Sequence, residues 1–121
     1  MKFICNQQTL AKALNTVSKA VSNRSTIPIL KGIQICATED GKLIMTASDL
    51  EISIKKEIEA DVTEPGAVVV MAKLFGDIIR KLPNEDILIS DEQEGSILIK
   101  TSFSEFNVVS FPTDEFPEIG I

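Results

Sequence analysis

The sequence has no histidine, only two cysteines and no acidic residue before Glu39. Without histidine, it cannot form the nucleophile–histidine pairs of many hydrolases, and two isolated thiols fall short of the four ligands of a structural zinc site. No stretch approaches the ~20 apolar residues of a membrane span, and the segment 1–6 turns polar too early for a secretory signal. We therefore expect a cytoplasmic protein with no metal, no cofactor and no membrane partner.

The two cysteines lie far apart in apolar, strand-like runs. Cys5 follows Phe3-Ile4, and Cys36 follows Ile33-Gln34-Ile35. Cytosolic cysteines of this kind are usually reduced and buried. A disulfide would be possible only if the two predicted strands were neighbours, so we expect two free, buried thiols.

Acidic residues are also absent from one part of the chain. The first 38 residues contain no carboxylate side chain but five cations, namely Lys2, Lys12, Lys19, Arg24 and Lys31. All 18 acidic residues follow, and the net charge is −6. A polyanion responds to the field within about one Debye length, roughly 8 Å at physiological salt. The net charge argues against a nucleic-acid partner, but the charge distribution makes one possible.

The length of 121 residues fits one domain, and the hydrophobic fraction of 44% fits a globular core. The segment 1–6 resembles a strand. Apolar residues then recur at helical spacing over 7–23, with Asn6 as the predicted N-cap. Three strand patterns follow, at 32–38, 42–47 and 50–58. The turn Glu39-Asp40-Gly41 joins the first two.

The same order begins again after Glu64-Pro65-Gly66. A strand is predicted at 67–71 and a helix at 72–82, which Pro83 ends. Three further strands are predicted at 87–90, 96–101 and 105–111. The chain thus reads as a strand–helix–three-strand unit repeated at an offset of roughly 65 residues. We predict an α+β fold in which this duplicated unit packs two helices on one side of an antiparallel sheet.

Each predicted helix has an apolar side and a cationic side. The apolar stripes run through Leu10, Leu14, Val17 and Val21 in one helix, and through Leu74, Phe75, Ile78, Ile79 and Leu82 in the other. Helical geometry points Lys12 and Lys19 of the first unit, and Lys73, Arg80 and Lys81 of the second, away from the sheet. These cations are candidate contacts to DNA phosphates. A solvated helix face without a ligand would have the same pattern.

Two other functions remain open at this stage. The excess of acidic over basic residues would suit a protein-interaction adaptor with no DNA role. Asp49 and Glu51 could instead be an acid/base pair in a small hydrolase, because both lie on the same side of an extended chain. No nucleophile–base arrangement accompanies them, so we do not expect an enzyme.

Several segments resemble the family of bacterial DNA sliding clamps, the beta subunits of DNA polymerase III. They are Met1-Lys2-Phe3, the run from Arg24 to Leu30, the corner from Thr46 to Ile52, Glu64-Pro65-Gly66-Ala67, and the ending from Phe111 to Pro117. Five such segments in the same order make the resemblance specific, and it covers the whole chain.

The resemblance implies the DNA-clamp fold and the role of a replication processivity factor. A family member has three domains of this size per subunit, and two subunits form a ring around duplex DNA. Residues 1–121 would be the first domain, contacting phosphates without reading sequence. The replicative polymerase and clamp loader would bind the other domains. Family members have DNA-contacting basic residues at the positions of Arg24 and Lys73.

The resemblance also suggests a subunit interface. The far edge of the first domain pairs with the third domain of the other subunit in the family. Phe106 and Val108 lie where apolar interface residues are found. Many members have basic residues near this edge, and Leu74 and Glu105 do not fit that pattern. The resemblance therefore leaves the electrostatic part of the interface open.

Overall fold

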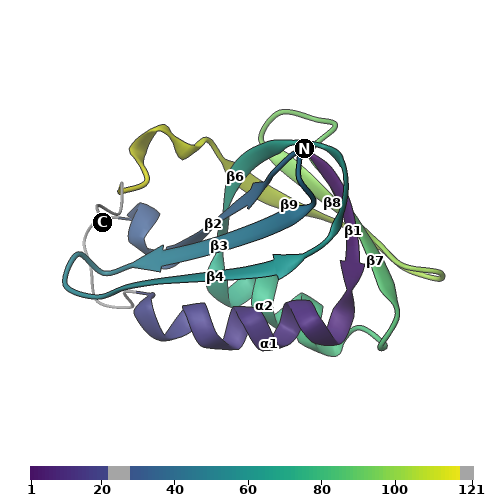
Figure 1. Cartoon of the computed structure of the whole chain (residues 1–121), viewed down its shortest axis with the longest axis horizontal. Coiled ribbons are helices and arrows are strands. Elements are labelled where there is room, and N and C mark those ends of the chain that lie inside the picture. Colours follow the sequence, from purple (N-terminus) through teal and green to yellow (C-terminus); the bar gives the residue numbers. More distant parts are fainter. Residues whose placement is uncertain (22–27, 118–121) are drawn as a thin grey trace.

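The computed structural model describes residues 1–21 and 28–117 (Figure 1). The helices in these residues are α1 (Gln7–Val17) and α2 (Ala72–Lys81), with short 3-10 turns η1 (Ser18–Ala20), η2 (Pro28–Lys31) and η3 (Thr113–Glu115). The strands are β1 (Lys2–Asn6), β2 (Gly32–Ala37), β3 (Lys42–Ser48), β4 (Ser53–Glu59), β5 (Asp61–Glu64), β6 (Gly66–Met71), β7 (Asp86–Ser90), β8 (Ser96–Lys100) and β9 (Glu105–Phe111).

The nine described strands form one antiparallel sheet in the order β4-β3-β2-β6-β9-β8-β7-β1-β5. This order interlocks the two repeated units. The first strand of each unit pairs with strands of the other, since β1 lies beside β7 and β6 lies beside β2. Each half therefore completes the sheet of its neighbour, and the duplication predicted from the sequence is confirmed.

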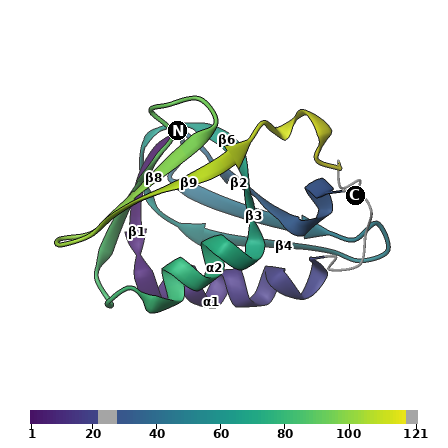
Figure 2. The same ribbon diagram turned by 180° about the vertical axis from the view of Figure 1, so that it is seen from behind.

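Both helices lie side by side against the same side of the sheet, in the front view and from behind (Figures 1 and 2). They run antiparallel. The start of α1 meets the end of α2, where the Gln7 side chain donates a buried 2.7 Å hydrogen bond to the Ile79 carbonyl oxygen. At the opposite ends, Ser18 and Ala72 line a common pocket. The predicted placement of both helices is confirmed.

The core lies between the helices and the sheet. Helical side chains with no exposed surface meet inward-facing side chains of β1, β2, β3, β7 and β8. The helical members are Leu10, Leu14, Val17, Phe75 and Ile79. Because apolar burial is worth about 25 cal/mol per Å², this layer fixes which side of each helix faces outward. Leu74, predicted on the inner stripe, is instead exposed.

The N-terminus of α1 agrees with its prediction. Asn6 has extended backbone, and its Oδ1 accepts a hydrogen bond of 3.1 Å from the Thr9 backbone N–H. The α-helix ends at Val17, earlier than predicted, and continues as the 3-10 turn η1. In the described part of the chain no helix is long and apolar enough to cross a membrane.

One strand prediction was wrong, and one strand was missed. The strand expected at 50–58 begins at Ser53, because Leu50 has a positive φ of 76° that breaks extended backbone. Leu50 and Ile52 are largely exposed rather than inward-facing. The short strand β5 was missed, since Val62 is its one apolar residue. It follows β4 after Ala60 and pairs with β1.

Candidate nucleic-acid interface

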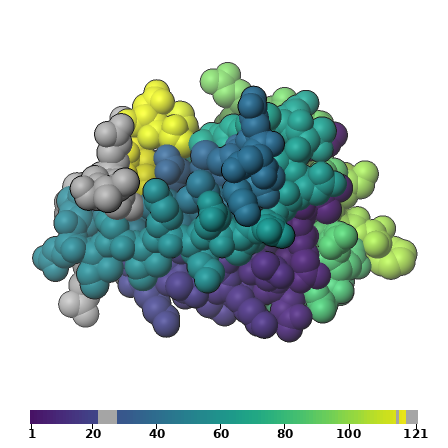
Figure 3. Space-filling model, in the orientation of Figure 1, coloured from purple at the N-terminus to yellow at the C-terminus, as the bar shows by residue number. Residues whose placement is uncertain are grey.

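The exposed sides of α1, η1 and α2 form one surface, which we call the helix face. In the space-filling view, α1 runs along the lower edge of the molecule (Figure 3). The cations predicted to point outward are exposed there, namely Lys12, Lys19, Lys73, Arg80 and Lys81. Lys12 and Lys19 are two helical turns apart, although Lys19 lies in the 3-10 turn. Arg24, the remaining predicted DNA contact, lies outside the described residues.

The charge of the helix face differs from that of the whole chain. No residue of α1 or η1 is acidic, and Asp77 is the one carboxylate in α2. The other acidic residues from Glu39 to Glu105 lie in strands and connecting turns. The side chains of these helical elements therefore carry an excess of positive charge, in contrast to the net charge of −6 of the whole chain.

Arg80 connects the two helices. One terminal nitrogen donates a hydrogen bond of 3.1 Å to Asn15 Oδ1 on α1, and the other pairs with Asp77 Oδ1 at 2.7 Å on its own helix. Both side chains of the ion pair are partly exposed, at 40% for Arg80 and 45% for Asp77. The guanidinium is thus held at the junction of the helices and remains open to solvent.

Glycine 76 provides room for that guanidinium. A Cβ added at Gly76 would lie 3.0 Å and 3.2 Å from the terminal nitrogens of Arg80. Such distances are shorter than ordinary van der Waals contact. The Arg80 guanidinium therefore lies close over the backbone of α2, one turn before its own residue.

Lys73 and Arg80 share a pocket at the start of α2. The pocket has a volume of about 240 Å³, and its other lining residues are Ser18, Val21 and Ala72. It combines two cationic side chains with a hydroxyl group and an apolar wall. The structure therefore brings two of the predicted DNA contacts together, and places Lys12 and Lys19 along the adjoining helix.

The predicted subunit-interface residues have different environments. Val108 is 3% exposed and belongs to the core, in register with Ile97 of β8. Phe106, two residues earlier on β9, is 36% exposed. Its side chain can contribute to an interface, whereas that of Val108 is already enclosed by its own domain.

The corner at Asp49 is a turn, not an acid/base pair. The Asp49 carboxylate accepts hydrogen bonds from the backbone N–H groups of Ile52 at 2.6 Å and Glu51 at 2.9 Å. These bonds hold the pKa of Asp49 below its ordinary value. The expectation that Asp49 and Glu51 share one side of an extended chain was wrong, because Leu50 has left-handed backbone.

Both cysteines are free, as predicted, but only Cys5 is buried, and Cys36 is partly exposed. Their strands β1 and β2 are not neighbours in the sheet. Cys5 is buried, and burial, together with the nearby charge of Asp86, raises the pKa of its thiol to about 12. In the described ranges, 1–21 and 28–117, no three Cys, Asp or Glu side chains are grouped as metal ligands.

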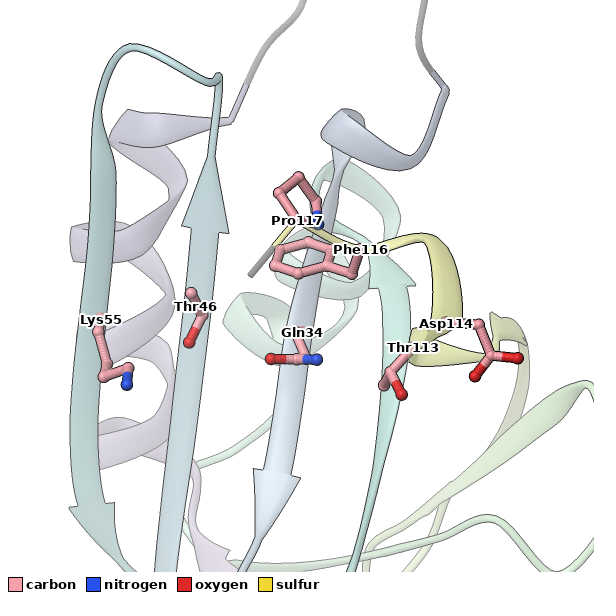
Figure 4. A pocket seen from close by; sticks show the side chains of 7 residues that line it. All are labelled: Gln34, Thr46, Lys55, Thr113, Asp114, Phe116 and Pro117. Carbon is pink, nitrogen blue, oxygen red and sulfur yellow. The ribbon is translucent and has the colours of Figure 1, made fainter. Parts of the chain in front are cut away.

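A second polar pocket lies on the sheet face away from the helices. It measures about 480 Å³, and Gln34, Thr46 and Lys55 line it in register across β2, β3 and β4. Figure 4 shows Phe116 and Pro117 beside this row, with Thr113 and Asp114 farther along. This pocket contains none of the predicted site residues.

The fold and the helix face define the class: a DNA-clamp domain, with a duplicated antiparallel sheet backed by two helices. The family model described as the DNA polymerase III beta subunit, N-terminal domain, matches residues 1–120. The chain belongs to this family.

Individual relatives agree with this assignment. The chain is 37% identical to the beta sliding clamp of Bacillus subtilis over 98% of its length, and 38% identical to that of Staphylococcus epidermidis over 97%. It covers 33% of each relative, so it spans about a third of the length of the curated proteins it matches.

Solved structures give the same result. The crystal structure of the DNA polymerase sliding clamp from Bacillus subtilis superposes on the whole chain with a TM-score of 0.95 at 35% identity. The Helicobacter pylori beta clamp bound to a DNA ligase peptide gives a TM-score of 0.92 at 28% identity. The chain covers 34% of each of these proteins.

Sequence reasoning missed two features of the helix face. Neither Asn15 nor Gly76 was predicted to have a role. The contact of Asn15 with Arg80 depends on how α1 and α2 lie beside each other, whereas that of Gly76 depends on the direction in which the Arg80 side chain runs along its own helix. One local signal for these contacts was available in the sequence. Gly76 and Asp77 precede Arg80 by four and three residues, which places them on the same side of the helix.

Proposed function

We propose that this chain is the first of three domains of a DNA sliding clamp, a replication processivity factor that encircles duplex DNA. The observation that supports the proposal most directly is the helix face, where Lys12, Lys19, Lys73 and Arg80 are exposed on two adjacent helices. Membership of the beta-subunit family supports the same role.

The helix face contacts the phosphate backbone in this proposal. Phosphate contacts position a protein on a duplex without specifying sequence, which suits a ring that slides. Lys73 and Arg80 contact phosphates near their shared pocket, and Lys12 and Lys19 extend the contact along α1. We propose Arg24 as a further contact from its sequence position.

The remaining partners belong to the assembled protein. Two subunits form a head-to-tail ring, with Phe106 at the subunit interface. Domains beyond this chain bind the replicative polymerase and the clamp loader. The domain is a non-catalytic accessory element, and encirclement supplies the persistence on DNA that a few phosphate contacts cannot.

A DNA titration tests the helix face. At about 10 mM salt, where the Debye length is roughly 30 Å, the chain should bind a labelled short duplex weakly and without sequence preference. At physiological salt, binding should be weaker than the usual non-specific range of roughly 10⁻⁴–10⁻⁶ M, because few cations are available. Fluorescence anisotropy measures both conditions.

Charge reversal supplies the control. Lys73→Glu should weaken low-salt binding and reduce its salt dependence, because it removes a phosphate contact. Lys100→Glu makes the same change of charge on β8, away from the helix face. Equal losses in the two variants, or binding that ignores salt, would contradict the proposal. A pure adaptor would show no DNA binding in any variant.

A further inference from the structure

We propose that Asp77 is an internal competitor of DNA. Its carboxylate holds the Arg80 guanidinium in the absence of DNA, and a backbone phosphate takes its place in the pocket lined by Lys73 and Arg80. This inference rests on the proposed function and assigns a positioning role to Asp77, which acts on DNA through Arg80.

The geometry of the ion pair supports an exchange of partners. Arg80 and Asp77 are 2.7 Å apart, yet both side chains keep a large exposed fraction. A carboxylate and a phosphate are alternative acceptors for a guanidinium, which binds both through its planar array of N–H groups. An exposed ion pair is worth little, so a phosphate at the same position can displace the carboxylate.

Two contacts keep Arg80 in place during that exchange. Asn15 accepts a hydrogen bond from the nitrogen that Asp77 does not hold. Gly76 leaves space for the guanidinium against the backbone of α2. Asn15 and Asp77 are held by different terminal nitrogens of Arg80, so the bond to Asn15 can persist while the nitrogen that now holds Asp77 donates to a phosphate. The guanidinium therefore needs to change its partner but not its position.

Lys73 identifies where the phosphate would bind. It lines the same pocket as Arg80 and precedes Asp77 by one helical turn. Because Asp77 pairs with Arg80, the charge of one of the two cations of the pocket is partly neutralised. The phosphate contact at Arg80 is then weakened, and a weak contact keeps the duplex free to move along the helix face.

Asp77→Asn separates charge from shape. The asparagine keeps the carbonyl oxygen that accepts from Arg80 but loses the negative charge. We expect the affinity for a short duplex at low salt to rise about two- to five-fold, because this is the range of free energy that an exposed ion pair contributes. The affinity should also depend more steeply on salt concentration. A merely structural role for Asp77 would leave affinity unchanged or reduce it.

Asp61→Asn is the matched control, because Asp61 is an exposed aspartate on the edge strand β5. An equal rise in both variants would attribute the effect to net charge and overturn the inference. If the unchanged chain binds DNA and Lys73→Glu weakens that binding, but Asp77→Asn has no effect, the inference alone fails. If the unchanged chain binds no DNA at low salt, the proposed function fails.

A second measurement follows Arg80 itself. Titration of the chain with inorganic phosphate should shift the NMR signal of the Arg80 Nε–H group. The shift should reach its midpoint at a lower phosphate concentration in Asp77→Asn than in Asp61→Asn. Identical midpoints would overturn the competition, whatever the DNA titrations show.

Discussion

Replacing Gly32 with alanine tests how closely the two halves of the sheet are packed. Gly32 is the first residue of β2 and lies opposite Met71 of β6, where the repeated units join beside the start of α2. A Cβ at this position would lie 2.5 Å from Val69 Cγ1, 3.1 Å from the Val70 carbonyl oxygen and 3.2 Å from the Ile29 carbonyl oxygen.

The magnitude follows from what surrounds that Cβ. Val69 has no exposed surface, and the two carbonyl oxygens belong to the backbone, so none of the three can move freely. Overpacking of this kind costs about 1–3 kcal/mol. We therefore expect Gly32→Ala to lower the free energy of unfolding by that amount.

Gly76→Ala is the matched comparison. Its Cβ would meet only the guanidinium end of Arg80, at 3.0–3.3 Å, so the end of one long side chain would have to shift by a few tenths of an ångström. Alanine is better than glycine in a helix interior by about 0.8–1.0 kcal/mol. The loss of an exposed hydrogen bond offsets part of this gain, so Gly76→Ala should be neutral or slightly stabilising.

Urea denaturation followed by circular dichroism measures both variants. The midpoint should fall for Gly32→Ala and stay or rise for Gly76→Ala, with unchanged slopes. If Gly32→Ala unfolds at the same urea concentration as the original chain, β2 and β6 are not packed as closely as we describe.

Two further predictions concern ionisable groups. Because its folded pKa is lowered, Asp49 stabilises the fold above its ordinary pKa of 3.8, and this contribution is lost as pH falls through the folded pKa. Asp49→Ala should therefore be less stable at neutral pH, with a smaller deficit in urea titrations at about pH 3; a constant deficit would contradict the turn. Because the pKa of Cys5 is about 12, mass spectrometry should find Cys5 unalkylated by iodoacetamide at about pH 8 in the folded chain and alkylated in urea. Rapid labelling of the folded chain would show that Cys5 is not buried.

The sequence predicted the repeated unit well because its periodicities are local. Asn6 marks the change from strand to helix, and Pro83 follows the end of α2. Apolar spacing also identified most buried helical residues. The interlocking of the units, with β1 beside β7, was not predicted, since strand partners depend on contacts between distant segments.

The errors have physical causes as well. Leu50 and Ile52 continued an alternating pattern, but the Asp49 carboxylate binds two backbone N–H groups and turns the chain there. Val108 belonged to the same alternation as Phe106, yet it lies in the core, in register with the buried Ile97. For the helix face, spacing predicted which cations are exposed. It could not show that Arg80 is shared between Asn15 and Asp77.

The most direct test of the central claim is a map of the surface that DNA contacts. We would add a short duplex at low salt to the isotopically labelled chain and record backbone NMR shifts. The account predicts that changes concentrate at Lys12, Lys19, Lys73 and Arg80, whatever the duplex sequence. Changes concentrated instead at Leu98 and Asn107, on the strands β8 and β9, would contradict it.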